Sequence, residues 1–127
     1  MAPVIGYWAI RGLGQPIRLM LKYCEVEFEE KRYLGKDAPG FDAEKDEDWF
    51  DVKFTLGLDF PNIPYYIDGD TKLTQTTAIL RYLARKHNLY GKNDEERALV
   101  DVVSGHVSDI RDGVIDVAYV ANSKEDH

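Results

Sequence analysis

Apolar and polar residues follow patterns that predict a strand, a helix and a second strand in the first part of the chain. Val4–Trp8 is a short apolar run followed by turn residues at Arg11–Gly14, which is typical of a buried strand. Pro16 favours a helix start, because the N–H that proline lacks has no helical partner in the first turn. Phe28–Leu34 alternates weakly and predicts the second strand. The helix between the strands has an apolar face at helical spacing, formed by Ile17, Met20, Leu21 and Cys24.

The middle of the chain predicts a loop, a short helical piece and a β-hairpin. Lys36–Asp48 is acidic and contains proline and glycine, which indicates an exposed loop. Trp49–Leu58 has a helical pattern that a glycine stops. Tyr65–Ile67 and Lys72–Thr74 flank Asp68-Gly69, a strong hairpin signal in which both central turn positions take a positive φ. We therefore expect an antiparallel pair of strands.

Two further helices are predicted after the hairpin. Gln75–Lys86 has an apolar face, formed by Ala78, Ile79, Tyr82 and Leu83. After a break at His87–Asn93, Asp94 is expected to cap a longer helix. Apolar residues step along that helix by 4, 3, 4, 3 and 4 positions, at Val103, Val107, Ile110, Val114, Val117 and Ala121. Such a seam requires another helix packed against it, from this chain or from a partner.

Length and charge limit the kinds of function. With 127 residues, the chain has room for one compact domain, or for one domain and part of another. The order of strands and helices predicts an α+β domain that ends near Asn88. The 23 acidic and 16 basic side chains give a net charge of −7. Because no block of Lys and Arg provides a positive stripe, the sequence disfavours nucleic acid as a partner.

The sequence predicts a cytoplasmic protein without a membrane segment. Its composition is that of an ordinary soluble globular protein, and its first residues lack the basic region and long apolar run of a secretory signal. The single cysteine, Cys24, fits a reducing compartment and allows no internal disulfide. Because Cys24 lies on an apolar helix face, we interpret it as a core thiol rather than a nucleophile.

Tyr7 is a candidate for thiol chemistry, because it lies where the first strand meets a turn that leads into a helix. A hydroxyl at that place could donate a hydrogen bond to a thiolate and favour the ionised form. Lowering the pKa of a free thiol, about 8.5, by about 2 requires only about 2.7 kcal/mol of preference for the anion. The alternative is a half-buried strand aromatic, which the residue type and position alone favour.

Spacing supports neither a metal site nor a nucleotide site. The three histidines are scattered, with no carboxylate at ligand spacing, so no metal is assigned; they are His87, His106 and His127. The aspartates of the last helix are interpreted as a solvated face, although one of them could reach a cation across a dimer interface. Gly12-Leu13-Gly14 lacks the third glycine of a phosphate loop, because Ile17 occupies that position.

Four long motifs resemble the mu class of cytosolic glutathione transferases. They are GYWxIRGL (Gly6–Leu13), QPIRLML (Gln15–Leu21), KFxLGLDFPNIPYYIDGD (Lys53–Asp70) and KLTQTTAILRYLARKHNL (Lys72–Leu89). The likeness covers nearly all of residues 3–93 and continues more loosely through Asp109–Tyr119. It implies a thioredoxin-like α+β N-terminal domain, βαβ-ββα, over residues 1–88. The first helix of an all-helical C-terminal domain, truncated, would occupy residues 89–127.

The resemblance implies how one end of glutathione and its sulfur are bound. Tyr7 would donate a hydrogen bond to the sulfur, and Trp8 and Leu13 would line the site there. Trp49 and Lys53 would hold the glycine carboxylate through charge-assisted contacts.

The resemblance also assigns residues to the rest of the tripeptide. Asn62 and Ile63 precede Pro64, whose peptide bond would be cis, so that the Ile63 backbone pairs with the cysteinyl part of glutathione by strand addition. Gln75 and Thr76 match the pair that binds the γ-glutamyl carboxylate at a helix start. Thr76 stands where serine is usual in this family, and we expect binding to survive because the hydroxyl is kept.

The resemblance assigns one more residue to glutathione binding and two to electrophile binding. Asp109 is similar to an aspartate that the other subunit of a dimer contributes to the γ-glutamyl ammonium group. Tyr119 resembles a second tyrosine on the electrophile side, where Ile10 would be apolar lining.

The implied function is conjugation of reduced glutathione, as co-substrate, to hydrophobic electrophiles, as in detoxification, by a homodimeric enzyme without a metal. The alternative is a truncated, non-catalytic module that binds glutathione or serves in subunit interaction. A thiol-disulfide oxidoreductase is disfavoured, because no cysteine lies in Tyr7–Pro16.

Overall fold

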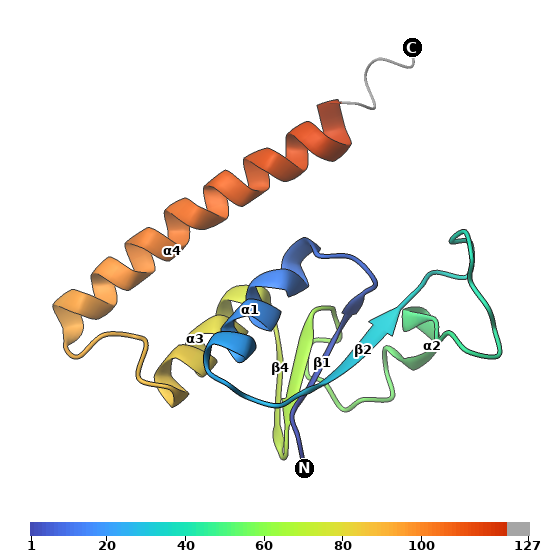
Figure 1. Ribbon diagram of the computed structural model, residues 1–127, viewed down its shortest axis with the longest axis horizontal. Coiled ribbons are helices and arrows are strands. Elements are labelled where there is room, and N and C mark those ends of the chain that lie inside the picture. Colours follow the sequence, from blue (N-terminus) through green and yellow to red (C-terminus); the bar gives the residue numbers. More distant parts are fainter. Residues whose placement is uncertain (122–127) are drawn as a thin grey trace. The chain divides into compact units, whose positions relative to one another are not determined.

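The computed structural model describes residues 1–121 of the chain. The chain folds into two compact units, one from Met1 to His87 and one from Asn88 onward. The first unit is built around a mixed sheet of four strands, and the second contains a long helix (Figure 1). Predictions that concern residues 122–127, including His127, lie outside the described residues.

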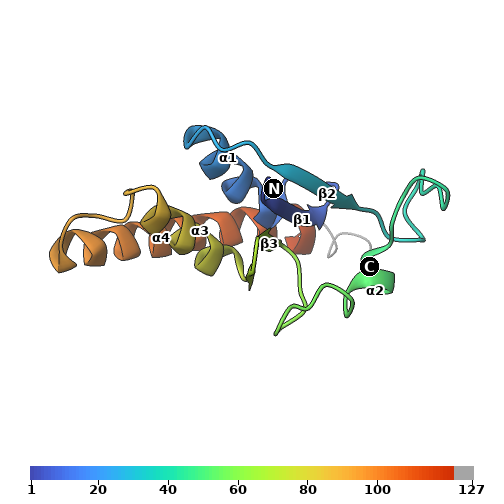
Figure 2. The same cartoon turned by 90° about the horizontal axis from the view of Figure 1, so that it is seen from below.

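The first unit has the predicted order of strands and helices. Its elements are β1 (Val4–Trp8), a 3-10 turn (Gly12–Gly14), α1 (Gln15–Tyr23), β2 (Glu29–Tyr33), α2 (Trp49–Val52), β3 (Tyr65–Asp68), β4 (Thr71–Thr74) and α3 (Thr76–Lys86). The strand order is β2-β1-β3-β4, with β1 parallel to β2 and antiparallel to β3. Because parallel neighbours need a crossover connection, α1 joins β1 to β2, which lie side by side in both views (Figure 2).

The two faces of the sheet carry different cores. Tyr65 and Tyr66 are neighbours on β3, and successive side chains of a strand point to opposite faces. Tyr66 belongs to a cluster that we call the aliphatic face, formed by Ile5, Ile17, Leu21, Tyr66, Ile79 and Leu83. Tyr65 belongs to the aromatic face, formed by Tyr33, Trp49, Leu58 and Tyr65. Helices α1 and α3 cover the aliphatic face, and α2 lies on the other side (Figure 1).

The helical piece predicted over Trp49–Leu58 is too long. Helix α2 ends at Val52, and turns follow. Leu58 is buried on the aromatic face, and the Lys72 ammonium donates a hydrogen bond to the Leu56 carbonyl at 2.8 Å. These tertiary contacts require the chain to fold back toward the sheet, which a continuous helix would prevent.

The hairpin turn lies one residue later than predicted. Asp68 still pairs with Thr71 in the ladder, so the two central turn residues are Gly69 and Asp70. Only Gly69 has a positive φ, of 59°. The strand therefore keeps Asp68, and glycine occupies the first central position of the turn.

The buried face of α3 is rotated from the predicted one. Ile79 and Leu83 are buried as expected, whereas Ala78 is exposed and Thr76 and Ala84 are buried instead. The Thr76 hydroxyl donates a hydrogen bond to the Leu13 carbonyl at 3.1 Å, which fixes the first turn of the helix in this orientation.

In the second unit, Asn93 caps the long helix in place of the predicted Asp94. Helix α4 (Asp94–Ile115) is followed by a π-helical segment (Asp116–Ala121). The Asn93 side chain accepts a hydrogen bond from the Glu96 N–H at 2.9 Å, and the Glu96 carboxylate accepts one from the Lys92 N–H at 2.6 Å. The bond from the Glu96 N–H to the Asn93 side chain makes Asn93 the cap.

The predicted apolar seam of α4 is largely exposed. Its described side chains are between 59% and 69% accessible, at Val103, Val107, Ile110, Val114 and Val117. Within residues 1–121, no helix combines the length and the apolar composition needed to cross a membrane.

Candidate active site

Tyr7 lies at the centre of the predicted site, enclosed by the turn that follows β1. Its ring is only 6% exposed, and its hydroxyl oxygen accepts a hydrogen bond from the Leu13 N–H at 3.1 Å. A Cβ atom on Gly12, whose φ is +38°, would lie 2.6 Å from the Tyr7 hydroxyl oxygen. A Cβ atom on Gly14 would lie 2.6 Å from the ring. The two glycines are therefore required for the turn to wrap the phenol.

The Leu13 hydrogen bond shapes what the phenol can do. A phenol oxygen can accept and donate at the same time. Because the Leu13 N–H already occupies an acceptor position, the hydroxyl proton is left for a partner, and hydrogen bonds in a chain strengthen one another. Tyr7 can therefore donate a hydrogen bond to an anion while it accepts one from the Leu13 N–H.

Leu13 also links Tyr7 to the start of α3. The Leu13 carbonyl accepts the hydrogen bond from the Thr76 hydroxyl, so that one residue joins Tyr7 and Thr76. The only proton of this hydroxyl is therefore used within the protein. An anion at this end of the site would instead meet the N–H groups of the first helical turn, which have no partner within the helix.

Gln75, directly before α3, has an unusual backbone. Its φ is +73° and its ψ is 114°, in a region that residues other than glycine seldom adopt, and its side chain makes no capping hydrogen bond. Such outliers cluster at ligand sites. Gln75 and Phe60 also line a hollow of about 330 Å³ beside β4.

The Ile63–Pro64 peptide bond is cis, as the resemblance implied. Pro64 is buried, and pairing of β3 with β1 and β4 begins only at the next residue, Tyr65. The Ile63 N–H donates to the Asn62 side chain at 2.9 Å. Ile63 lies outside the paired part of β3, and an extended ligand that paired with its backbone would take the Ile63 N–H from the Asn62 side chain.

Trp49 and Lys53 are positioned by α2 and by the aromatic face. The Trp49 ring centroid lies 5.5 Å from that of Tyr33, and the side chain is 3% exposed. Lys53 follows the helix, and its N–H donates to the Trp49 carbonyl at 2.9 Å. Trp8, from β1, lies near the same helix, with its ring centroid 6.2 Å from that of Phe50.

Asp48 anchors α2, although its place in an acidic segment predicted only an exposed loop. Its carboxylate is 5% exposed and accepts hydrogen bonds from the Phe50 N–H at 2.7 Å and the Lys36 N–H at 2.9 Å. The first bond caps the helix, and the second ties the loop to it. Asp48 thereby sets the position of Trp49 and Lys53.

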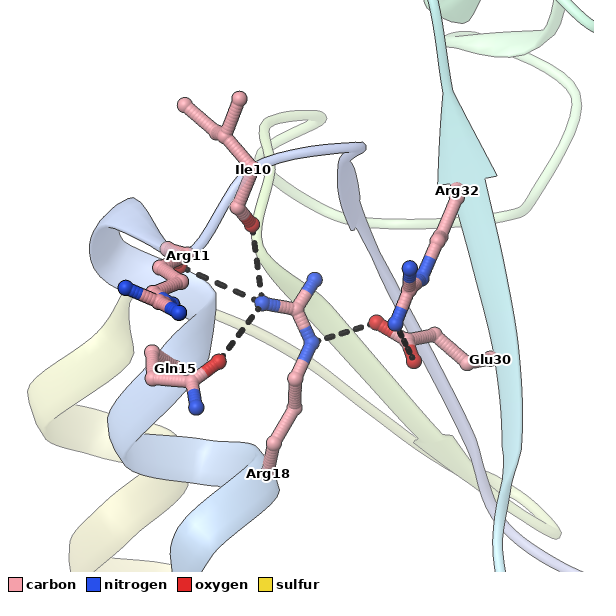
Figure 3. Close-up of polar contacts among 6 residues, drawn as sticks. All are labelled: Ile10, Arg11, Gln15, Arg18, Glu30 and Arg32. Atoms are coloured by element: carbon pink, nitrogen blue, oxygen red, sulfur yellow. Dashed lines mark hydrogen bonds and ion pairs between the residues drawn. The ribbon is translucent and has the colours of Figure 1, made fainter.

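Arg18 is a second residue that the sequence did not single out (Figure 3). Its Nη1 donates to the Ile10 carbonyl at 2.9 Å and to the Arg11 carbonyl at 3.3 Å, and its Nε donates to Glu30. Its guanidinium carbon lies 5.9 Å from the centroid of the Tyr7 ring. These partners come from separate segments, so no spacing in the sequence indicates the cluster.

Glu30 is the counter-charge in this cluster. Burial raises the pKa of its carboxyl, but the hydrogen bonds and charges of Arg32 and Arg18 outweigh burial and hold the pKa below its usual value. Arg32 donates to Glu30 at 3.1 Å and is itself mostly exposed.

Three predicted site residues remain, one on the first unit and two on the second. Ile10 is 52% exposed on the turn after β1. Asp109 lies on α4 and Tyr119 on the π-helical segment, both in the second unit. The roles of these three residues stay predictions. In the part of the chain that the structure describes, no group of three or more His, Cys, Asp or Glu side chains is arranged to hold a metal ion.

Comparison with known families decides the assignment. The family model described as "Glutathione S-transferase, N-terminal domain" matches residues 3–85. The chain belongs to the glutathione S-transferase family. The turn around Tyr7, the cis-Pro64 loop and the start of α3 all lie within the matched residues.

The relatives agree with the mu-class resemblance. Glutathione S-transferase Mu 1 of Oryctolagus cuniculus is 52% identical, and the match covers 94% of this glutathione S-transferase chain and 53% of the relative. A glutathione S-transferase of Dermatophagoides pteronyssinus is also 52% identical, over 94% of this chain and 53% of its own length. The chain thus spans about half the length of the curated relatives it matches.

Solved structures confirm the fold. The Pi-class glutathione S-transferase of Onchocerca volvulus matches with a TM-score of 0.80 and 33% identity, over 97% of this chain and 53% of that chain. The predicted class, a thioredoxin-like domain followed by a long helix, is therefore confirmed for this glutathione S-transferase chain.

Proposed function

We propose that this chain binds glutathione and that Tyr7 stabilises the glutathione thiolate for conjugation to hydrophobic electrophiles. The observation that carries this proposal is the hydrogen bond from the Leu13 N–H to a Tyr7 hydroxyl whose ring is buried. It leaves the phenol proton for an incoming sulfur. A hydrogen bond to a charged group contributes about 1.5–3 kcal/mol, which corresponds to lowering the thiol pKa by about 1–2.

Glutathione would lie across the edge of the first unit in an extended conformation. Its sulfur would meet Tyr7, lined by Trp8 and Leu13, and its cysteinyl backbone would pair with Ile63 after Asn62. The position of Ile63 outside the ladders supports this orientation. Strand addition of this kind gives affinity through main-chain hydrogen bonds.

The two ends of the tripeptide would be held by charge. Lys53, beside Trp49, would bind the glycine carboxylate, and the N–H groups at the start of α3, after Gln75 and at Thr76, would bind the γ-glutamyl carboxylate. The unusual Gln75 backbone and the position of Lys53 at the end of α2 support these roles. Asp109 of a partner subunit in a homodimer would bind the γ-glutamyl ammonium group.

The reaction requires only glutathione as co-substrate. The thiolate would attack an apolar electrophile, forming a sulfur–carbon bond and releasing the leaving group, with no covalent enzyme intermediate. We further propose that the protein acts in the cytoplasm, where glutathione is kept reduced.

The test compares wild type with Tyr7→Phe. Calorimetry with glutathione should show binding by both proteins, because the phenol contacts only the sulfur. The fraction of bound thiolate and the conjugation rate should fall, the rate by roughly 100-fold, as when one donor to a developing charge is removed. Tyr23→Phe is the matched control, because Tyr23 is 76% exposed. Absence of glutathione binding by folded wild type would overturn the proposal.

The alternative, a non-catalytic chain that acts in subunit interaction, is favoured by one observation. The apolar seam of α4 remains exposed among the described residues. Under this alternative, sedimentation should show self-association, while the wild-type chain with bound glutathione should give no conjugation above the solution rate.

A further inference from the structure

Arg18 has an unusual environment for a charged side chain on a helix. Its side chain is only 11% exposed, and it is paired with Glu30, whose side chain is 19% exposed. Withdrawing a guanidinium from water costs several kcal/mol unless it is paired and hydrogen-bonded. Arg18 is paired and hydrogen-bonded in this way beside the Tyr7 ring, although none of the roles proposed above uses it.

The hydrogen bonds of Arg18 converge on the turn that carries Leu13. Nη1 donates to the carbonyls of Ile10 and Arg11, at 2.9 and 3.3 Å, and to the Gln15 side chain at 3.2 Å (Figure 3). These carbonyls belong to the segment between Tyr7 and the Gly12–Gly14 turn. A peptide unit is planar, so fixing two successive carbonyls fixes the path of the backbone that leads to Leu13.

Glu30 anchors the other side of the guanidinium. Its carboxylate binds Nε of Arg18 and also accepts from Arg32. Because Glu30 lies on β2 and Arg18 on α1, the cluster joins a strand, a helix and the turn. The charged and titratable side chains that face the guanidinium are Tyr7, Glu30 and, through Glu30, Arg32.

We propose that Arg18 is a positioning residue that holds the Ile10–Gly14 turn so that the Leu13 N–H stays on the Tyr7 hydroxyl. Through this contact Arg18 sets how much of the bound glutathione is thiolate. The first statement concerns the protein alone, and the second rests on the proposed function. Arg18 itself touches neither substrate nor reacting atoms.

A purely electrostatic role is the competing explanation. Arg18 and Arg32 carry two positive charges against one negative charge on Glu30, so the cluster has a net charge of +1 beside the Tyr7 ring. Arg18→Lys separates the two explanations. Lysine keeps the charge but presents a point donor, which cannot serve Glu30, Gln15 and the carbonyls in the fixed geometry of a guanidinium.

The first measurement uses the chain without glutathione. Amide hydrogen exchange of Leu13, followed by NMR, should be about tenfold faster in Arg18→Lys and in Arg18→Met than in wild type, which corresponds to weakening by about one hydrogen bond. Arg32→Met is the matched control, because Arg32 contacts Glu30 but not the turn and is mostly exposed. Its Leu13 exchange should equal that of wild type.

The second measurement adds glutathione. The pKa of the bound thiol, followed by ultraviolet absorbance of the thiolate, should rise by about one pH unit in both Arg18 variants, with conjugation slowed about tenfold at neutral pH. Glutathione affinity should change little. If Arg18→Met does not fold, Glu30→Gln, which keeps the side-chain shape but removes the anchoring charge, should raise the thiol pKa in the same direction.

The outcomes are distinct. Unchanged Leu13 exchange in folded Arg18 variants overturns the proposal, as does a full return to wild-type values in Arg18→Lys, which would leave charge as the sole cause. Faster exchange with an unchanged thiol pKa overturns the statement that Arg18 sets the thiolate fraction of bound glutathione. If wild type does not take up glutathione, that statement and the proposed function fail together. The exchange result alone then decides whether Arg18 positions the turn.

Discussion

The aliphatic and aromatic faces of the sheet hold different parts of the site by different interactions. On the aliphatic face, α1 and α3 pack by hydrocarbon contact, through residues such as Leu21 and Ile79. This packing places the turn around Tyr7 and the start of α3. On the aromatic face, the hydroxyl oxygens of Tyr33 and Tyr65 are 2.8 Å apart. The buried Asp48 carboxylate there caps α2 with one hydrogen bond and ties the loop at Lys36 to the helix with another.

The difference teaches which changes each face can tolerate. Hydrocarbon packing is non-directional, so the aliphatic face responds to lost volume and much less to the identity of the apolar group. The aromatic face contains polar groups that must keep named partners, so the loss of a single atom leaves another group unsatisfied. The following predictions test this contrast, from the largest expected effect to the smallest.

Leu21→Ala should have the largest effect on stability. Leu21 is fully buried on the aliphatic face, and removing its side chain should lower the free energy of unfolding by about 2–5 kcal/mol. Leu19→Ala, on the same helix but 61% exposed, should change it by less than about 0.5 kcal/mol. Urea unfolding of both variants measures the difference. Equal losses would show that the aliphatic face is not the core.

Asp48→Ala should lower the free energy of unfolding by about 2 kcal/mol, because it removes a helix cap and leaves the Lys36 N–H without its partner. Asp51→Ala removes only an exposed ion pair with Lys36 and should cost less than about 0.5 kcal/mol.

The same variant tests the role of α2 in binding. If Asp48 positions Lys53 for the glycine carboxylate, Asp48→Ala should weaken binding of glutathione more than binding of γ-glutamylcysteine, which lacks glycine. Equal weakening in calorimetry would contradict that role.

Tyr33→Phe should cost about 1–2 kcal/mol, because the Tyr65 hydroxyl then lacks its buried partner. Phenylalanine at both positions removes the pair together, so the double variant should lose less than the sum of the single losses. Additive losses in urea unfolding would show that the two hydroxyls do not interact.

Alkaline pH should reveal the same pair through a smaller effect. Burial raises the pKa of Tyr33, and the hydrogen bond with Tyr65 raises it further; burial is also the largest cause that raises the pKa of Tyr65. Above about pH 10 the unfolded chain releases these protons while the folded chain keeps them, so stability falls as pH rises. The double phenylalanine variant should fall less steeply, as measured by urea midpoints across that range.

Local patterns predicted much of the framework. The apolar run of Val4–Trp8 became β1 with those bounds, and the helical spacing from Ile17 to Leu21 became the buried side of α1. The resemblance, carried by long motifs, predicted the cis bond before Pro64. In each case the signal lies in consecutive residues, which are also the residues that form the structure.

The same local signals failed where a particular hydrogen bond made the choice. Asp94 and Asn93 both have capping side chains, and the hydrogen bond from the Glu96 N–H to the Asn93 side chain decided for Asn93. Asp48 belongs to an acidic stretch that indicates solvent, yet the loop at Lys36 covers it. Residue type alone does not show which segments will meet.

The sequence by itself determined the order of strands and helices and the family, because periodicity and motif are properties of neighbouring residues. Only the tertiary structure decided that Leu13 joins Tyr7 to Thr76 and that the Arg18 guanidinium donates to the Ile10 carbonyl, in the segment that leads to Leu13. The physical reason is that a buried polar group is stable only beside its partner, and the partner comes from wherever the folded chain returns.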